Sequence, residues 1–126
     1  MLVVTRFDVE PEGAAAFLEQ GRAALDAFAG RPGFARGHLG RAADDPRAWV
    51  LVTQWDGVGS YRRALGAHEV KVHAAPLLAQ GRDEPSAFEV LRSVEGDVAS
   101  VAVSHRAADA DVVGLGRASG PATSDL

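Results

Sequence analysis

A histidine and an arginine are the residues of this sequence best suited to carry chemistry. His73 follows Glu69 by four positions in a segment with helical spacing, so the carboxylate can orient the imidazole from the same helix face. Arg6 lies in an apolar, β-branched segment that we expect to be covered on both faces, where a guanidinium needs a carboxylate partner or an anionic ligand. Asp8 shares its strand face, so Arg6 either binds a ligand or forms a structural or intersubunit ion pair. His73 is either a pocket residue or an ordinary histidine of a helix surface.

Composition narrows the classes of function. The 126 residues are 47% hydrophobic, which suits one domain with a substantial core. The absence of cysteine excludes disulfides, thiolate catalysis and zinc–thiolate sites. A net charge of −4 gives no reason to expect a nucleic-acid partner. We see no signal peptide and no apolar run of membrane-spanning length, so we expect no membrane partner and a cytoplasmic location.

The distribution of aromatic residues predicts where the domain ends. All of them lie before residue 93: Phe7, Phe17, Phe28, Phe34, Trp49, Trp55, Tyr61 and Phe88. Residues 94–126 are rich in Ala, Asp, Ser, Gly and Val, and bury too little apolar area to offset their ordering entropy. The sequence therefore predicts a domain over residues 1–93 and a mostly flexible tail over residues 94–126. Within that tail, residues 98–103 could add an edge strand.

Four segments have the pattern of strands and three have the pattern of helices. The predicted strands are residues 2–9, 34–41, 47–55 and 85–92. The predicted helices are residues 12–29, 57–66 and 67–79. The order β-α-β-β-α-β is that of an α+β, ferredoxin-like fold with an antiparallel sheet. Both faces of the strand at 47–55 are largely apolar, which indicates cover on both sides.

Short motifs in this order carry a resemblance to a known family. They are Arg31-Pro32-Gly33-Phe34, Asp44-Asp45-Pro46, Trp55-Asp56, Tyr61-Arg62-Arg63-Ala64-Leu65, His73 and Phe88-Glu89-Val90. Over residues 1–93 the sequence resembles the antibiotic biosynthesis monooxygenase (ABM) domain family of the dimeric α/β-barrel superfamily. The resemblance implies that two ferredoxin-like subunits pair sheet to sheet as a homodimer, with a pocket between each sheet and its own helices. Such pairing would explain the two apolar faces of the strand at 47–55.

The resemblance also suggests a reaction, although the family is chemically mixed. Some members oxidise anthrones or related phenols with oxygen and neither metal nor flavin, and others are quinol oxygenases. It implies a monooxygenase of a small aromatic or quinol-like molecule, which itself supplies the electrons as a carbanion or phenolate. His73 would be the base, Arg6 would hold the anion and Tyr61 would donate a hydrogen bond. The expected substrate-binding residues are Trp49, Trp55, Leu65 and Glu69.

Two alternatives remain open. The first is a non-catalytic dimeric protein that binds a small molecule, in which the aromatic residues are ordinary core. The second is haem binding or degradation, because a histidine matching His73 ligates iron in haem-degrading relatives. Those relatives carry an asparagine and a tryptophan where this sequence has Arg6 and Ala64, so we expect no haem cleavage. Apart from haem at His73, we expect no cofactor and no metal.

Overall fold

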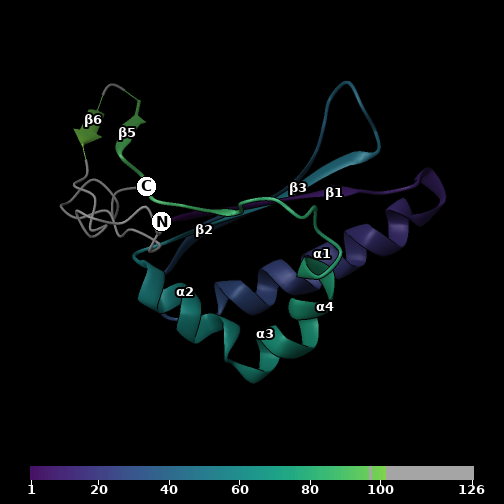
Figure 1. Ribbon diagram of the computed structural model, residues 1–126, viewed down its shortest axis with the longest axis horizontal. Helices are drawn as coiled ribbons and strands as arrows, with labels where there is room; N and C mark the ends of the chain where they lie inside the picture. The colour runs from purple at the N-terminus through teal and green to yellow at the C-terminus, as the bar shows by residue number, and fades with distance from the viewer. Residues whose placement is uncertain (97, 102–126) are drawn as a thin grey trace.

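A four-stranded antiparallel sheet with helices on one face forms the body of the computed structural model, which describes residues 1–96 and 98–101 (Figure 1). Its strand order is β2-β3-β1-β4. The strands are β1 (Leu2–Asp8), β2 (Phe34–Arg41), β3 (Ala48–Trp55) and β4 (Ala87–Phe88). The helices are η1 (Pro11–Gly13), α1 (Ala14–Ala29), α2 (Val58–Leu65), α3 (His68–His73) and α4 (Ala75–Leu78). The α+β fold with an antiparallel sheet that the sequence predicts is confirmed.

The helix-facing side of the sheet forms the hydrophobic core. Along β3, every second side chain is buried on this side, as the two-residue period of a strand requires. These residues are Trp49, Leu51, Thr53 and Trp55. The buried residues of α1 that cover them are Phe17, Gly21, Ala24 and Phe28.

The opposite, outer face of the sheet is free of helices in the part of the chain that the structure describes (Figure 1). The register of β1 and β3 pairs Val4 with Val52 and Arg6 with Val50 on this face. Val4, Val50 and Val52 are only half-buried in the single chain. Both faces of β3 are therefore apolar, but among the described residues helices cover only one of them.

The predicted helix over residues 67–79 is divided into α3 and α4 at Ala74. Pro76 lies in the first turn of α4, where its missing N–H costs no helical hydrogen bond. It could not donate that bond in the middle of one continuous helix, which accounts for the break. None of the helices in the described ranges has the length and apolar character needed to cross a bilayer.

The last strand of the sheet is shorter than predicted. β4 contains only Ala87 and Phe88, because Pro85 cannot donate to the ladder just before it. The preceding segment nevertheless follows the edge of β1. The Arg82 amide donates to the Arg6 carbonyl at 2.8 Å, and the Val4 amide donates to the Ser86 carbonyl at 2.7 Å.

A separate two-stranded sheet follows the main one. It consists of β5 (Arg92–Glu95) and β6 (Val98–Val101), which pair as an antiparallel hairpin. This hairpin crosses the predicted domain boundary at residue 93. β6 pairs with β5 instead of extending the main sheet as an edge strand. The remainder of the expected flexible tail, residues 97 and 102–126, lies outside the described residues.

Candidate functional site

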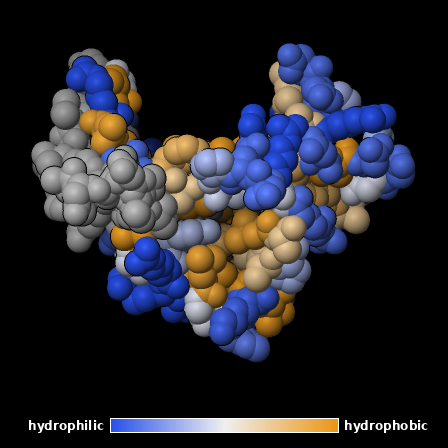
Figure 2. All heavy atoms as spheres, viewed as in Figure 1, coloured by the Kyte–Doolittle hydropathy of each residue, from blue (hydrophilic) through white to orange (hydrophobic). Residues whose placement is uncertain are grey.

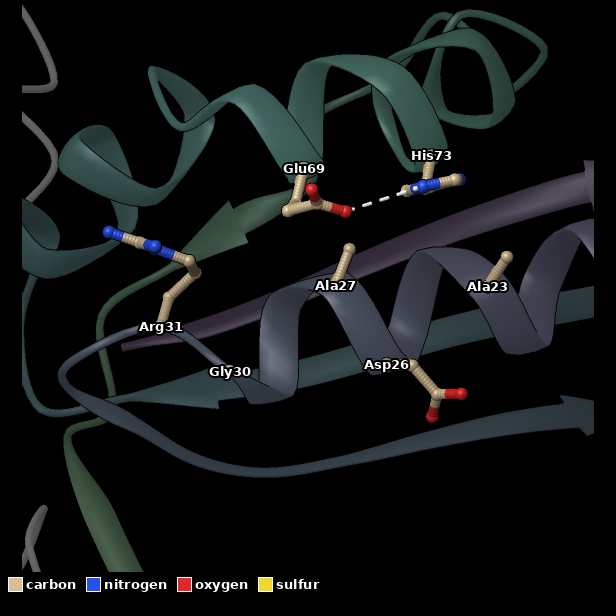
Figure 3. A pocket seen from close by; sticks show the side chains of 7 residues that line it. All are labelled: Ala23, Asp26, Ala27, Gly30, Arg31, Glu69 and His73. Carbon is tan, nitrogen blue, oxygen red and sulfur yellow. Dashed lines mark ion pairs between the residues drawn. The ribbon is translucent and has the colours of Figure 1, made fainter.

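A cavity of about 360 Å³ lies between α1 and α3 (Figure 3). Its lining residues are Ala23, Asp26, Ala27, Gly30, Arg31, Glu69 and His73. Ala23 and Ala27 lie four residues apart, so they share a helix face, and Gly30 follows them. These residues have a methyl group or no side chain, so the two helices meet without filling the space between them. The sequence analysis gave this stripe no role.

Glu69 and His73 point from α3 toward α1 on one side of this cavity (Figure 3). Glu69 Oε2 lies 3.4 Å from His73 Nε2, as their four-residue spacing predicts. The two side chains are 65% and 46% exposed, so a molecule entering from solvent can reach them. With a proton on Nε2 facing the carboxylate, Nδ1 retains a lone pair that can accept a proton. The pair can therefore act as a carboxylate-oriented base.

Arg31 supplies a cation to the same cavity from the end of α1 (Figure 3). Its Nε is buried and has no hydrogen-bond partner within the part of the chain that the structure describes. The guanidinium group as a whole lines the cavity, and its planar set of N–H donors is suited to a carboxylate, phenolate or enolate. Sequence reasoning used Arg31 only as part of a turn motif. The small-residue stripe that ends beside it was the signal that could have singled it out.

A second cavity of about 230 Å³ extends the first past His73. The two cavities share Ala23 and His73. The remaining lining of the second cavity is Gln20, Val72, Pro76, Leu77 and Gln80. His73 is thus placed between a charged compartment and a more apolar one.

The three predicted aromatic site residues lie in packed clusters and line neither of these two cavities. Trp55 is fully buried, with Phe28, Phe34 and Tyr61 around it at centroid distances of 5.4–5.7 Å for the two phenylalanines and 5.5 Å for Tyr61. Its indole N–H donates to Thr53 Oγ1 at 2.9 Å. Burial raises the pKa of Tyr61, so its hydroxyl is a donor at neutral pH.

Trp49 and Leu65 lie apart from His73 as well. Trp49 is 7% exposed and packs edge-on against Phe17 at 5.2 Å, and Arg41 stacks on its ring at 5.4 Å. The Trp49 indole nitrogen is buried and has no hydrogen-bond partner among the described residues. Leu65 is partly exposed on α2, beside the buried Ala64. Of the predicted substrate-binding residues, only Glu69 lines the cavity that contains His73.

Arg6 lies on the outer face of the sheet, on the other side from His73. Its Nε donates to Glu84 Oε2 at 2.7 Å and its Nη2 donates to Glu84 Oε1 at 3.0 Å. Asp8, the partner considered from the sequence, is instead bound by Arg82 at 2.7 and 3.1 Å. Arg6 is therefore in a structural ion pair, which was one of the alternatives left open by the sequence, but its partner is Glu84 and not Asp8. An edge segment far away in the sequence supplies both partners, which strand spacing cannot reveal.

These two ion pairs shift the pKa values of all four groups. The hydrogen bonds from Arg6 lower the pKa of Glu84, and those from Arg82 lower the pKa of Asp8. The carboxylates in turn raise the pKa of Arg6 and Arg82. Glu84 uses two of the five N–H groups of the Arg6 guanidinium, and both residues line an outer-face cavity of about 590 Å³.

No cluster of three or more His, Cys, Asp or Glu residues that could hold a metal ion occurs among the described residues. A haem at His73 would have to displace Glu69 from Nε2 or bind through Nδ1, on a half-exposed helix face. The matching position for the haem-contacting tryptophan holds Ala64, which is buried. Nothing in this geometry favours haem over an organic ligand.

Comparison with known proteins identifies the family. Residues 1–75 match the family model described as antibiotic biosynthesis monooxygenase. This match covers more than half of the 126 residues, and the chain therefore belongs to the antibiotic biosynthesis monooxygenase family. No curated protein matches the chain.

Solved structures share the fold. SnoaB, a cofactor-independent oxygenase from Streptomyces nogalater, is 31% identical, with a TM-score of 0.56 over 64% of this chain and 82% of that one. A conserved protein from Methanosarcina mazei Go1 is 19% identical, with a TM-score of 0.57 over 68% and 83%. A protein from Nitrosomonas europaea assigned as an antibiotic biosynthesis monooxygenase is 20% identical, with a TM-score of 0.55 over 67% and 87%. The last two likenesses show the fold alone.

Proposed function

We propose that the protein is a monooxygenase that oxidises a small aromatic or quinol-like molecule with O₂, without a metal or flavin. The observation that carries this proposal is membership of the monooxygenase family together with 31% identity to SnoaB, a cofactor-independent oxygenase. The cavity between α1 and α3 supports it, because a base and a cation line the same space. We place the reacting part of the substrate there, beside His73.

In such a reaction the substrate supplies the electrons. His73, oriented by Glu69, accepts a proton from a ring CH₂ or a phenol, and the resulting carbanion or phenolate passes electrons to O₂. One oxygen atom enters the substrate and the other leaves as water, so R₂CH₂ and O₂ give R₂C=O and H₂O. Arg31 holds the negative charge while it exists. Arg31 thus takes the role that the sequence analysis assigned to Arg6, and Tyr61 stays a predicted donor.

Oxygen uptake with a panel of anthrones and quinols tests this proposal. We expect turnover by the wild type, a loss of about 10²-fold or more in His73→Ala, and a loss of about tenfold or more in Arg31→Ala. His68→Ala on the same helix and Arg22→Ala on α1 are matched controls that should retain the wild-type rate. Wild type without turnover of any compound would contradict the reaction, and full activity in His73→Ala would contradict the site.

A second candidate function is the non-catalytic binding of a small molecule. The observation that favours it is the dense packing between sheet and helices, where Phe7, Phe28 and Trp55 are at most 1% exposed. A ligand would then occupy the half-exposed cavity between α1 and α3 without being converted. Saturable binding of a compound that consumes no oxygen, weakened by Arg31→Ala, would favour this function over the oxygenase.

We infer further that two copies pair through their outer sheet faces. Val4, Val50 and Val52 form an apolar strip there, and no helix of the described residues covers it. Many such residues in one sheet indicate cover by another layer. The family resemblance supports a second copy as that layer, and a two-fold axis would then set identical strips against each other.

A further inference from the structure

The second cavity adjoins the first along one face of α1. Figure 3 shows Arg31 at one end of the first cavity, with Ala23 and His73 at the other end. Because Ala23 and His73 also line the second cavity, it lies beyond the end that is farther from Arg31. From Gln20 to Gly30, the lining of the two cavities follows α1 over a rise of about 15 Å. The two cavities together are thus longer than one aromatic ring, and the second, at about 230 Å³, is smaller than the roughly 300–1,000 Å³ of a separate ligand pocket.

The two cavities differ in charge. Asp26, Arg31 and Glu69 line the first cavity and do not line the second. Among the described residues, the lining of the second cavity consists of apolar side chains, the shared histidine and the two amides of Gln20 and Gln80. A glutamine amide both donates and accepts hydrogen bonds but carries no charge. The second cavity is therefore suited to an uncharged, largely apolar group with a hydroxyl or carbonyl at its edge.

Apolar surface is open to solvent in the lining of the second cavity. Val72 is 49% exposed, whereas Leu77, which lines the same cavity, is buried. Figure 2 shows hydrophobic surface over the region of α3 and α4, while α2 presents mainly hydrophilic residues. A flat ring placed in the cavity would contact Val72 and Pro76 and would remove their apolar surface from water. The exposure of Val72 is thus explained if a ligand covers it.

We propose that the second cavity binds the part of the substrate that does not react, an uncharged ring bearing a hydroxyl or carbonyl group. Val72, Gln20 and Gln80 would then determine specificity for this part. The inference rests on the proposed function, which places the reacting group beside His73, and it narrows the substrate from any small aromatic to one with fused rings. Gln80 Nε2 donates to the Pro76 carbonyl at 3.4 Å, so the amide oxygen of Gln80 can accept from a ring hydroxyl.

Equilibrium binding of two compounds that the reaction cannot oxidise tests the second cavity without turnover. Anthraquinone-2-carboxylate has a carboxylate for Arg31 and a far ring that reaches the second cavity, whereas benzoate fills only the first. We expect the wild type to bind the anthraquinone at least about 100-fold more tightly than benzoate. Val72→Asp should reduce this ratio about tenfold and leave benzoate binding unchanged, because the far ring would desolvate the new carboxylate.

A pair of ligands that differ by one hydroxyl tests the two amides. We expect 6-hydroxyanthraquinone-2-carboxylate to bind the wild type about fivefold more tightly than anthraquinone-2-carboxylate, because its far-ring hydroxyl gains a hydrogen bond. In the full-length double variant Gln20→Leu/Gln80→Leu, the two ligands should bind equally. Lys71→Asp on α3 and Glu19→Leu on α1 are matched controls, since these exposed neighbours line neither of the two cavities and should preserve all the ratios.

The outcomes separate this inference from the proposed reaction. Wild-type ratios in both Val72→Asp and the double glutamine variant would overturn the role of the second cavity, while oxygen uptake with anthrones could still stand. A wild type that binds neither anthraquinone more tightly than benzoate would overturn it as well. If the ligands bind as expected but no anthrone is oxidised, the reaction fails and the second cavity remains part of a binding site.

Discussion

Arg6 shows how one residue changes its meaning once its partners are known. As a lone cation in an apolar strand it suggested an anion site, but its guanidinium is held by Glu84 through two hydrogen bonds. Arg82 binds Asp8, two residues further along β1, through two hydrogen bonds in the same way. The two pairs fasten the segment before β4 to the edge of β1, where the Arg82 amide also bonds the Arg6 carbonyl. Their role is to close the sheet edge.

The ion pairs predict a pH dependence of stability. Folding lowers the pKa of Glu84 and Asp8 below their unfolded values of about 4.3 and 3.9. Their stabilising contribution is therefore fully present above those values and is lost as pH falls through the lower folded values. In Glu84→Gln the free energy of unfolding should decline less steeply between about pH 5 and pH 2 than in the wild type. Urea unfolding at several pH values measures the two slopes.

Both side chains of each pair are partly exposed, so salt should weaken this effect. Glu12→Gln, which removes an exposed carboxylate from η1, controls for the loss of one negative charge. Equal slopes for Glu84→Gln and the wild type would show that the bond to Arg6 contributes nothing to stability. That result would return Arg6 to consideration as a ligand-binding cation.

At the scale of elements, the turn between α1 and β2 depends on one glycine. Gly33 has a φ of +87°, in the left-handed region that favours glycine. A Cβ built there would overlap Ser60 Oγ and lie 2.7 Å from Asp56 Oδ1, while the Ser60 hydroxyl donates to that carboxylate. The Gly33 carbonyl also accepts from the Asp56 amide at 2.9 Å. The turn therefore couples the end of α1 to the start of α2.

Gly33→Ala should lower the free energy of unfolding by about 2 kcal/mol or more, because it adds a strained φ to a steric overlap. Urea denaturation of the variant and the wild type gives this difference. Gly13→Ala is a suitable control, since a Cβ there meets only Val9 at 4.0 Å and the backbone is helical. A stability loss no larger than that of Gly13→Ala would mean that the turn relaxes freely.

Much of the secondary structure can be predicted from the sequence, because it depends on local hydrophobic periodicity and on the glycine and proline residues that end helices and strands. The apolar segment at 47–55 predicts β3, although not which of its two apolar faces the helices cover, and Gly30 marks the end of α1. The break at Ala74 and the shortened β4 escape the prediction, although Pro76 and Pro85 stand beside them. At these two positions, the packing of the chain in three dimensions determines whether the proline ends a helix or strand or only interrupts it.

In the candidate site, too, contacts within one helix can be predicted from the sequence, whereas contacts between helices cannot. Glu69 and His73 are predicted to meet because four residues on one helix fix their geometry. Arg31 joins them only because α3 crosses α1 near its end, which no spacing in the sequence expresses. Trp49 and Trp55 were expected to contact the ligand. An aromatic residue is equally suited to line a pocket or to pack in a core, so its type alone does not distinguish the two. The choice between those two uses depends on how closely the neighbouring elements pack.

At the scale of the whole molecule, the two sides of the sheet have different tasks. Helices cover one side and hold the cavity with His73, whereas the outer side presents half-buried valines that no helix of residues 1–96 covers. A sheet-to-sheet dimer would bury that strip without touching the cavity. Activity and association should therefore respond to different substitutions, which allows each to be tested without the other.

The substitution Val52→Asp should weaken association of the two copies without affecting activity. Val52 lies on the outer face between Val4 and His38 in the paired strands, so a carboxylate there would be desolvated by the facing copy. We expect the dissociation constant of the dimer to rise about 100-fold or more in sedimentation experiments, with little change in the cavity between α1 and α3. A variant that dimerises as tightly as the wild type would show that the copies associate through another surface. A monomeric variant that still consumes oxygen would show that the cavity in one chain is complete by itself.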